Sequence, residues 1–122
     1  MSRTKEILVI DDNEDVGEVV CATAESVKMQ CRLATNVDEF LAELSADTDI
    51  IFLDIKMPDM NGRELLELLG ANHCSAGIVL MSGLGDTVLR QTEAYGLGLG
   101  LKMIGVLSKP FRVAELLVLL RK

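Results

Sequence analysis

The stretch from Asp49 to Pro58 constrains the fold more than any other part of the sequence. Its apolar run, Ile50 to Leu53, is followed at once by Asp54. A continuous apolar run of this length predicts a strand buried on both faces, as in parallel sheets covered by helices. Because Pro58 restricts the preceding residue to extended or turn conformations, the chain must leave the sheet there. The stretch therefore predicts a carboxylate at the carboxyl end of a central strand, where open α/β sheets bind ligands.

Similar apolar runs recur along the chain, and amphipathic helical patterns separate them. Besides 50–53, strands are expected at 7–10, 31–34, 77–81 and 104–108, and helices at 14–29, 37–44, 65–69, 86–95 and 113–120. Asn13, Asn36 (with Glu39 in a capping box) and Asp86 are expected to cap helices, and Gly70 to end one. The alternation predicts one domain over residues 1–122, a flavodoxin-like, doubly wound parallel sheet of five strands in order 2-1-3-4-5 with five helices.

The composition restricts the type of core, the partners and the cellular compartment that the chain can have. Hydrophobic residues make up 49% of the chain and aromatic residues only 3%, so the predicted core is aliphatic. A net charge of −7 argues against nucleic acid as a direct partner, because phosphate binding needs a basic surface. No apolar run reaches the length of a membrane span, and the polar start of the chain does not resemble a signal peptide. Cys21, Cys31 and Cys74 are scattered, which favours reduced thiols packed as small hydrophobes in a cytoplasmic protein.

Polar side chains stand where the predicted strands end. Asp11 and Asp12 follow the first strand, Asp54 the third, Ser82 the fourth and Lys109 the fifth. Parallel strands bring these ends to one edge of the sheet. Three carboxylates in one pocket repel each other unless a cation lies among them, and oxygen ligands suit Mg²⁺, or Mn²⁺ in its place.

A carboxylate beside such an ion can act as a nucleophile on phosphorus. Lys109 would then neutralise the phosphoryl oxygens, and Ser82 would donate a hydrogen bond to one of them. Taken singly, each residue has a plainer interpretation: a helix cap for Asp11 and Asp12, a turn residue for Asp54, a loop hydroxyl for Ser82 and a solvated charge for Lys109. Their shared position at successive strand ends favours the functional interpretation.

Four segments resemble the signature blocks of the receiver domain of two-component response regulators. They are IDDNE at 10–14, LDIKMPDMNG at 53–62, MSG at 81–83 and SKPF at 108–111. The resemblance covers essentially the whole chain. It implies a signalling domain, not an enzyme, that accepts a phosphoryl group on Asp54 from a histidine kinase or a phosphotransfer protein.

The same resemblance implies roles for the surrounding residues. Asp12, Asp54 and the backbone carbonyl of Lys56 would ligate Mg²⁺, with Asp11 acting largely through water. Lys109 would pair with the acids and then with the phosphoryl group, and Ser82 would move toward that group. The peptide bond from Lys109 to Pro110 is expected to be cis, as it usually is in such domains.

The sequence departs from the family pattern in two places. Val106 stands where receivers commonly carry a tyrosine or phenylalanine, three residues before Lys109. The segment 83–103 is longer than usual and contains Gly96, Gly98 and Gly100, which are expected to end the fourth helix. This segment resembles receivers attached to cyclic-di-GMP phosphodiesterase output domains.

Other hypotheses remain open at this point. An interaction module with this fold could work without phosphorylation, which Val106 favours. A flavin carrier or an aspartyl phosphatase would use the same fold, but no Ser/Thr-rich phosphate loop is present, and Lys56 stands where such phosphatases have a second acid. The consecutive apolar residues at 116–120 predict a surface covered by a homodimer partner or an output domain. His73 is expected to face solvent.

Overall fold

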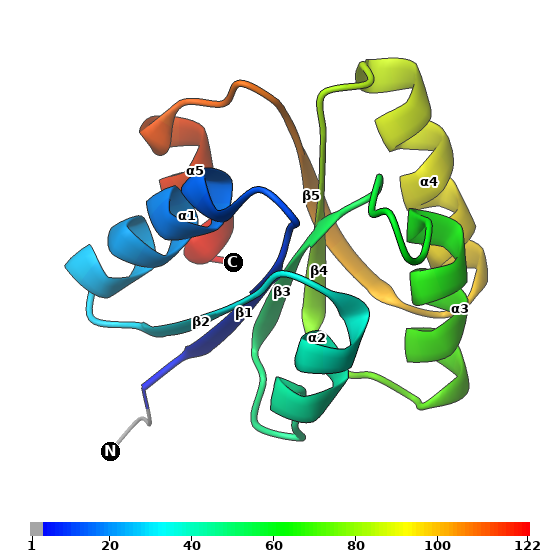
Figure 1. The fold of residues 1–122 in the computed structure, drawn as a ribbon, viewed down its shortest axis with the longest axis horizontal. Helices are drawn as coiled ribbons and strands as arrows, with labels where there is room; N and C mark the ends of the chain where they lie inside the picture. The colour runs from blue at the N-terminus through cyan, green and yellow to red at the C-terminus, as the bar shows by residue number, and fades with distance from the viewer. Residues whose placement is uncertain (1–3) are drawn as a thin grey trace.

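A computed structural model of the protein describes residues 4–122 and contains a five-stranded parallel sheet (Figure 1). The strand order is β2-β1-β3-β4-β5, as the sequence predicts for a flavodoxin-like fold. In chain order the elements are β1 (Glu6–Ile10), α1 (Glu14–Ser26), β2 (Gln30–Ala34), α2 (Val37–Glu43), β3 (Ile50–Asp54), α3 (Gly62–Ala71), β4 (Gly77–Ser82), α4 (Asp86–Gly98), β5 (Lys102–Ser108) and α5 (Val113–Leu120).

Helices cover both faces of the sheet. Helices α1 and α5 lie on one face, and α2, α3 and α4 lie on the other (Figure 1). The buried side chains divide accordingly into two aliphatic clusters, one on each face. Every residue of β3 is buried, because this strand lies at the centre of the sheet with helices above and below. This confirms the burial that the apolar run predicts.

Two of the predicted helix caps are confirmed. The side chain of Asn13 accepts a hydrogen bond from the backbone of Asp15, and that of Asn36 accepts one from the backbone of Glu39. The capping box expected at Asn36 is incomplete, because the Glu39 carboxylate accepts instead from the backbone and hydroxyl of Thr35. A complete capping box occurs at Asn61, which starts α3.

Other predicted helix ends are wrong. The N-cap of α4 is Gly85, at φ 105°, and Asp86 is the first helical residue. Gly70 lies within α3, and the left-handed conformation that follows this helix is adopted by His73, at φ 53°. His73 itself is exposed, as expected.

Helices α1 and α4 also end differently from their predicted limits. Helix α1 ends at Ser26 instead of residue 29, because Lys28 takes a φ of 65° that reverses the chain into β2. The expectation that glycines end α4 is confirmed for two of them: Gly98 is its last residue, and Gly100, at φ 81°, turns the chain after it, whereas Gly96 lies inside the helix. Gly96 allows close packing, since a Cβ there would lie 2.6 Å from the sulfur of Met103 on β5.

The cysteine prediction is wrong for two of the three residues. Cys21 on α1 and Cys31 on β2 form a disulfide, and all three cysteines are half-buried. Within residues 4–122, Cys74 is the free cysteine. The pairing depends on how α1 lies on β2, which the spacing in the sequence does not encode.

The outer surface retains apolar side chains. Val113 and Val118 of α5 have exposed fractions of 51% and 59%, and Leu97 at the end of α4 has 58%. Among residues 4–122, no helix has both the length and the apolar character needed to cross a bilayer.

Candidate functional site

The polar residues predicted from the strand ends meet at one rim of the sheet. A cavity of about 520 Å³ opens there, at the carboxyl ends of β3, β4 and β5. It is lined by Asp12, Asp54, Lys56, Met57, Pro58, Ser82, Gly83, Leu84 and Lys109. Asp11 lies beside it, within hydrogen-bond distance of Lys109. The structure therefore brings together every side chain that the sequence placed at this rim.

Lys109 bridges two carboxylates of the cluster. Its Nζ donates to Oδ2 of Asp11 at 2.7 Å and lies 3.6 Å from Oδ2 of Asp54. Asp11 is fully buried, and its other carboxylate oxygen accepts a hydrogen bond from the backbone of Asn13 at 2.9 Å. The peptide bond from Lys109 to Pro110 is cis, as expected. Asp11 is thus a buried carboxylate with both oxygens engaged, which is the condition under which buried charges are stable.

Asp54 is nearly as buried but has weaker partners. Its side chain is 7% exposed, and Oδ1 accepts a 3.3 Å hydrogen bond from the backbone of Lys56. Burial, and then repulsion from Asp11, raise its pKa from 3.8 to about 6, although Lys109 acts in the opposite direction. Asp54 is therefore held in a cluster with an excess of negative charge.

The acid cluster has the composition of a hard-cation site. Carboxylate oxygens of Asp11, Asp12 and Asp54 all lie within 4.8 Å of one another. Three carboxylates against one ammonium leave negative charge uncompensated, and Mg²⁺ takes such oxygen ligands while it keeps several waters. The residues present therefore fit Mg²⁺. The backbone carbonyl of Lys56 stays a predicted ligand.

Ser82 and Val106 lie on the neighbouring strands β4 and β5. Ser82 is 1% exposed, and its hydroxyl oxygen accepts a hydrogen bond from the backbone of Leu84 at 2.8 Å. Val106 pairs with Leu80 across β4 and β5 and is half-buried against the cluster beneath α3 and α4. Leu84 was not predicted as a site residue, although it lines the cavity with an exposed fraction of 50%. Its position two residues after Ser82 is the signal that could have identified it.

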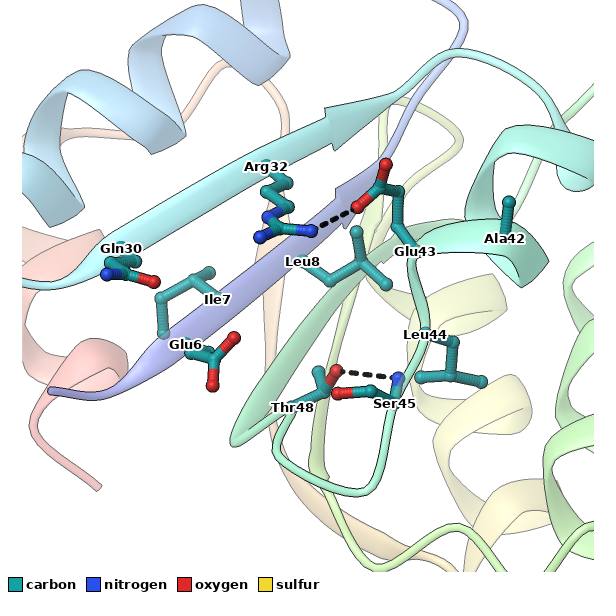
Figure 2. Close-up of a pocket in the computed structure, with 10 residues that line it drawn as sticks. All are labelled: Glu6, Ile7, Leu8, Gln30, Arg32, Ala42, Glu43, Leu44, Ser45 and Thr48. Carbon is teal, nitrogen blue, oxygen red and sulfur yellow. Dashed lines mark hydrogen bonds and ion pairs between the residues drawn. The ribbon is translucent and has the colours of Figure 1, made fainter. Parts of the chain in front are cut away.

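A second cavity, of about 260 Å³, lies near the amino ends of β1 and β2 and is flanked by α2 (Figure 2). Two charged residues at this cavity pair with each other, since Arg32 forms a 2.5 Å ion pair with Glu43, which raises the pKa of Arg32. The hydroxyl of Thr48 accepts a hydrogen bond from the backbone of Ser45 at 3.2 Å. These two contacts are internal to the fold. The acid cluster, by contrast, lies at the rim where open α/β sheets bind ligands.

Comparison with known proteins agrees with this geometry. Residues 7–121 match the family model described as the response regulator receiver domain. The chain belongs to this family. The receiver domain is 32% identical to the transcriptional regulatory protein FixJ of Azorhizobium caulinodans, in an alignment that covers 99% of the chain and 56% of FixJ. It is 30% identical to the transcriptional regulatory protein CusR of Escherichia coli K12, over 94% of the chain and 49% of CusR.

The receiver domain thus spans about half the length of these two relatives. Among solved structures, it superposes on the chemotaxis response regulator CheY4 of Vibrio cholerae with a TM-score of 0.80 at 23% identity, over 98% of each chain, which shows the shared fold. A response regulator from Burkholderia pseudomallei, solved with a phosphorylated aspartic acid, a calcium ion and citrate, gives a TM-score of 0.76 at 26% identity, over 95% of this chain and 66% of that one.

Proposed function

We propose that the receiver domain, over residues 1–122, is a Mg²⁺-dependent phosphoacceptor switch that takes a phosphoryl group from a phosphohistidine onto Asp54. The observation that carries this proposal is the placement of Asp54, a buried carboxylate with a raised pKa that lies 3.6 Å from the ammonium of Lys109 in a cluster of acids. The phosphorylated aspartic acid and the calcium ion in the Burkholderia regulator support it.

The chemistry follows from the positions of these side chains. A carboxylate oxygen of Asp54 attacks phosphorus, the phosphorus–nitrogen bond breaks, and its electron pair stays on the imidazole that leaves. Lys109, between Asp11 and Asp54, is positioned to pair with a phosphoryl oxygen. The hydroxyl oxygen of Ser82 accepts from the backbone of Leu84, so its proton is available to donate to another phosphoryl oxygen. Bound at the carboxylates, Mg²⁺ would neutralise charge on the transferring group.

The proposal is tested with acetyl phosphate as the phosphoryl donor. With Mg²⁺, intact-mass measurement should show one added phosphoryl group on the wild-type protein, no addition to an Asp54→Asn variant, and strongly reduced addition when EDTA removes the metal. An Asp38→Asn variant is the matched control, because Asp38 is an exposed acid on α2 that does not line the cavity. Equal labelling of the Asp54→Asn variant would refute the assignment.

We infer that the physiological donor is a histidine kinase or a phosphotransfer protein in the cytoplasm. Because the matched relatives are about twice as long as this chain, an output domain is a proposed partner, and the exposed apolar residues of α5 suit either such a domain or a second copy. The receiver of NtrC4 was solved as a beryllofluoride-activated dimer. A cyclic-di-GMP phosphodiesterase output stays a prediction from the glycine-rich segment, and the two relatives described above are transcriptional regulators.

A second candidate function is partner binding without phosphorylation. Val106 favours it, because a half-buried valine lacks the aromatic ring whose position couples to the hydroxyl in related receivers. This candidate predicts that partner affinity is the same with and without beryllofluoride. A large change in affinity would eliminate it and support the switch.

A further inference from the structure

We propose that Cys21 and Cys31 are a redox modification site, a thiol pair that closes reversibly into a disulfide and fastens α1 to the edge strand β2. The two residues are disulfide-bonded, with their Cα atoms 5.0 Å apart. That separation lies within the range of about 4.4–6.8 Å that a disulfide can span. The site lies away from the phosphoacceptor cavity, and nothing in the proposed phosphoryl chemistry uses it.

The packing of α1 on β2 explains why these two cysteines meet. Gly17 and Cys21 lie on one face of α1, four residues apart, which is an axial rise of about 6 Å. Leu33 and Cys31 are two residues apart on one face of β2, which is about 6.6 Å. Because the two spacings agree, the contact of Gly17 with Leu33 aligns Cys21 with Cys31.

The contact at Gly17 is close enough to fix this alignment. A Cβ at position 17 would lie 2.2 Å from a methyl carbon of Leu33, so glycine allows the observed approach without displacing that side chain. The next strand residue, Arg32, points the other way, toward Glu43 of α2 (Figure 2). Cys31 therefore faces α1 by the alternation of the strand, and the pairing belongs to the fold itself.

The pair is placed where a reductant can reach it. Strand β2 is the last strand on its side of the sheet, and both cysteines are half-buried at the margin of the cluster under α1. The turn that joins α1 to β2 holds without the bond, since the backbones of Val27 and Met29 both donate to Ala24, at 3.1 and 3.0 Å. The dithiol form is therefore expected to stay folded, which a reversible modification requires.

The redox potential of the compartment decides whether this disulfide is permanent or reversible. This step rests on the cytoplasmic setting proposed above. In the cytosol, glutathione and thioredoxin keep thiols reduced, and disulfides that do form there are usually transient, catalytic or redox-sensing. The oxidant proposed here is a small disulfide such as oxidised glutathione. One cysteine thiolate attacks it and releases one glutathione thiolate, and the second cysteine then displaces the other glutathione. Two protein thiols become one disulfide, and one oxidised glutathione becomes two reduced molecules; a dithiol reductant reverses the exchange.

The test equilibrates the native chain with glutathione mixtures from fully reduced to fully oxidised, followed by acid quenching, alkylation and intact-mass measurement. A Cys74→Ser variant removes the third thiol and serves as the working background. In it, the protein should pass from dithiol to internal disulfide, without a stable glutathione adduct, and return when reduced glutathione is restored. A Cys21→Ser variant in the same background should instead accumulate a glutathione adduct on Cys31.

Hydrogen exchange measured on the same samples supplies the structural readout. Amides of α1 near Cys21 should exchange about tenfold or more faster in the dithiol form, an order-of-magnitude estimate from the loop that the bond closes. The inference is overturned if the disulfide withstands excess reductant until denaturant is added, if it never forms in oxidised glutathione, or if exchange in α1 is the same in both forms. Labelling of Asp54 by acetyl phosphate is measured alongside. A protein that cycles between the two forms but is not labelled would refute the phosphoacceptor proposal and leave this one intact.

Discussion

Replacing Asp54 by asparagine should stabilise the folded protein, although it removes the proposed phosphoacceptor. The carboxyl group is 7% exposed, and its contacts include a 3.3 Å hydrogen bond and a 3.6 Å ion pair. Burial and the neighbouring charge of Asp11 favour its neutral form and raise its pKa to about 6. At pH 8 the folded chain must therefore hold a charge that its surroundings disfavour, whereas asparagine carries none.

The magnitude follows from the linkage between proton binding and stability. Between the unfolded pKa of 3.8 and the folded pKa of about 6, the native state binds more protons at Asp54 than the unfolded state does. Stability must therefore fall as the pH rises through this interval. At about 1.4 kcal/mol for each pH unit, the full cost at pH 8 is about 3 kcal/mol, and at pH 4 it is below about 1 kcal/mol.

This cost is measured by urea unfolding of the wild type and the Asp54→Asn variant in EDTA, monitored by circular dichroism at pH 4, 6 and 8. The measured quantity is the difference in unfolding free energy between the two proteins at each pH. The variant should gain about 3 kcal/mol at pH 8 and lose most of that gain at pH 4. An Asp38→Asn control, at an exposed position, should show no such trend. Mg²⁺ at 100 times its Kd should stabilise the wild type by about 2.7 kcal/mol. The difference in unfolding free energy between the variant and the wild type should then become smaller. A variant no more stable than wild type at pH 8, or a gain that does not depend on pH, would refute the reasoning.

Three further substitutions test close packing, helix propensity and a buried charge pair in turn. Gly62→Ala should lower the unfolding free energy by about 1–3 kcal/mol in urea titration, because the new Cβ would lie 2.8 Å from the Cβ of Ile55 and 3.0 Å from its Cα. Gly98→Ala, a change in helix α4 with open space around it, should instead raise the urea midpoint and stabilise by up to about 1 kcal/mol. Lys109→Met should cost about 3 kcal/mol at pH 7, since it leaves the buried carboxylate of Asp11 without its 2.7 Å partner; a melting temperature equal to that of wild type would contradict this.

The sequence predicts the sheet and its functional rim well, for a physical reason. Parallel strands buried on both faces appear as continuous apolar runs, and their carboxyl ends must share one edge. Asp54, Ser82 and Lys109 could therefore be grouped without knowledge of any distance. The number of strands and the approximate positions of the helices follow from the same alternation, and the strand order agrees with the flavodoxin-like order that this count suits.

Features that depend on tertiary register were mispredicted. The left-handed residue after α3 is His73, although Gly70 is the residue that intrinsic preference favours there. Asp86 is a good cap by type, but Gly85 begins the turn because its φ of 105° suits glycine. The pairing of Cys21 with Cys31 requires the match between a helical and a strand spacing, which no residue pattern reports.

The geometry also distinguishes the proposed phosphoacceptor from the other two clustered acids, independently of any motif. Asp11 has a partner on each oxygen, at 2.9 and 2.7 Å, so its charge is stabilised and its lone pairs are engaged. Asp12 is exposed, and solvent can stabilise its charge. Asp54 alone among the three combines near-complete burial with long contacts, so its charge is compensated less closely than that of Asp11 and solvated less than that of Asp12. A nucleophile on an incoming phosphoryl group needs an available lone pair close to a cation, and within this cluster that combination occurs at Asp54.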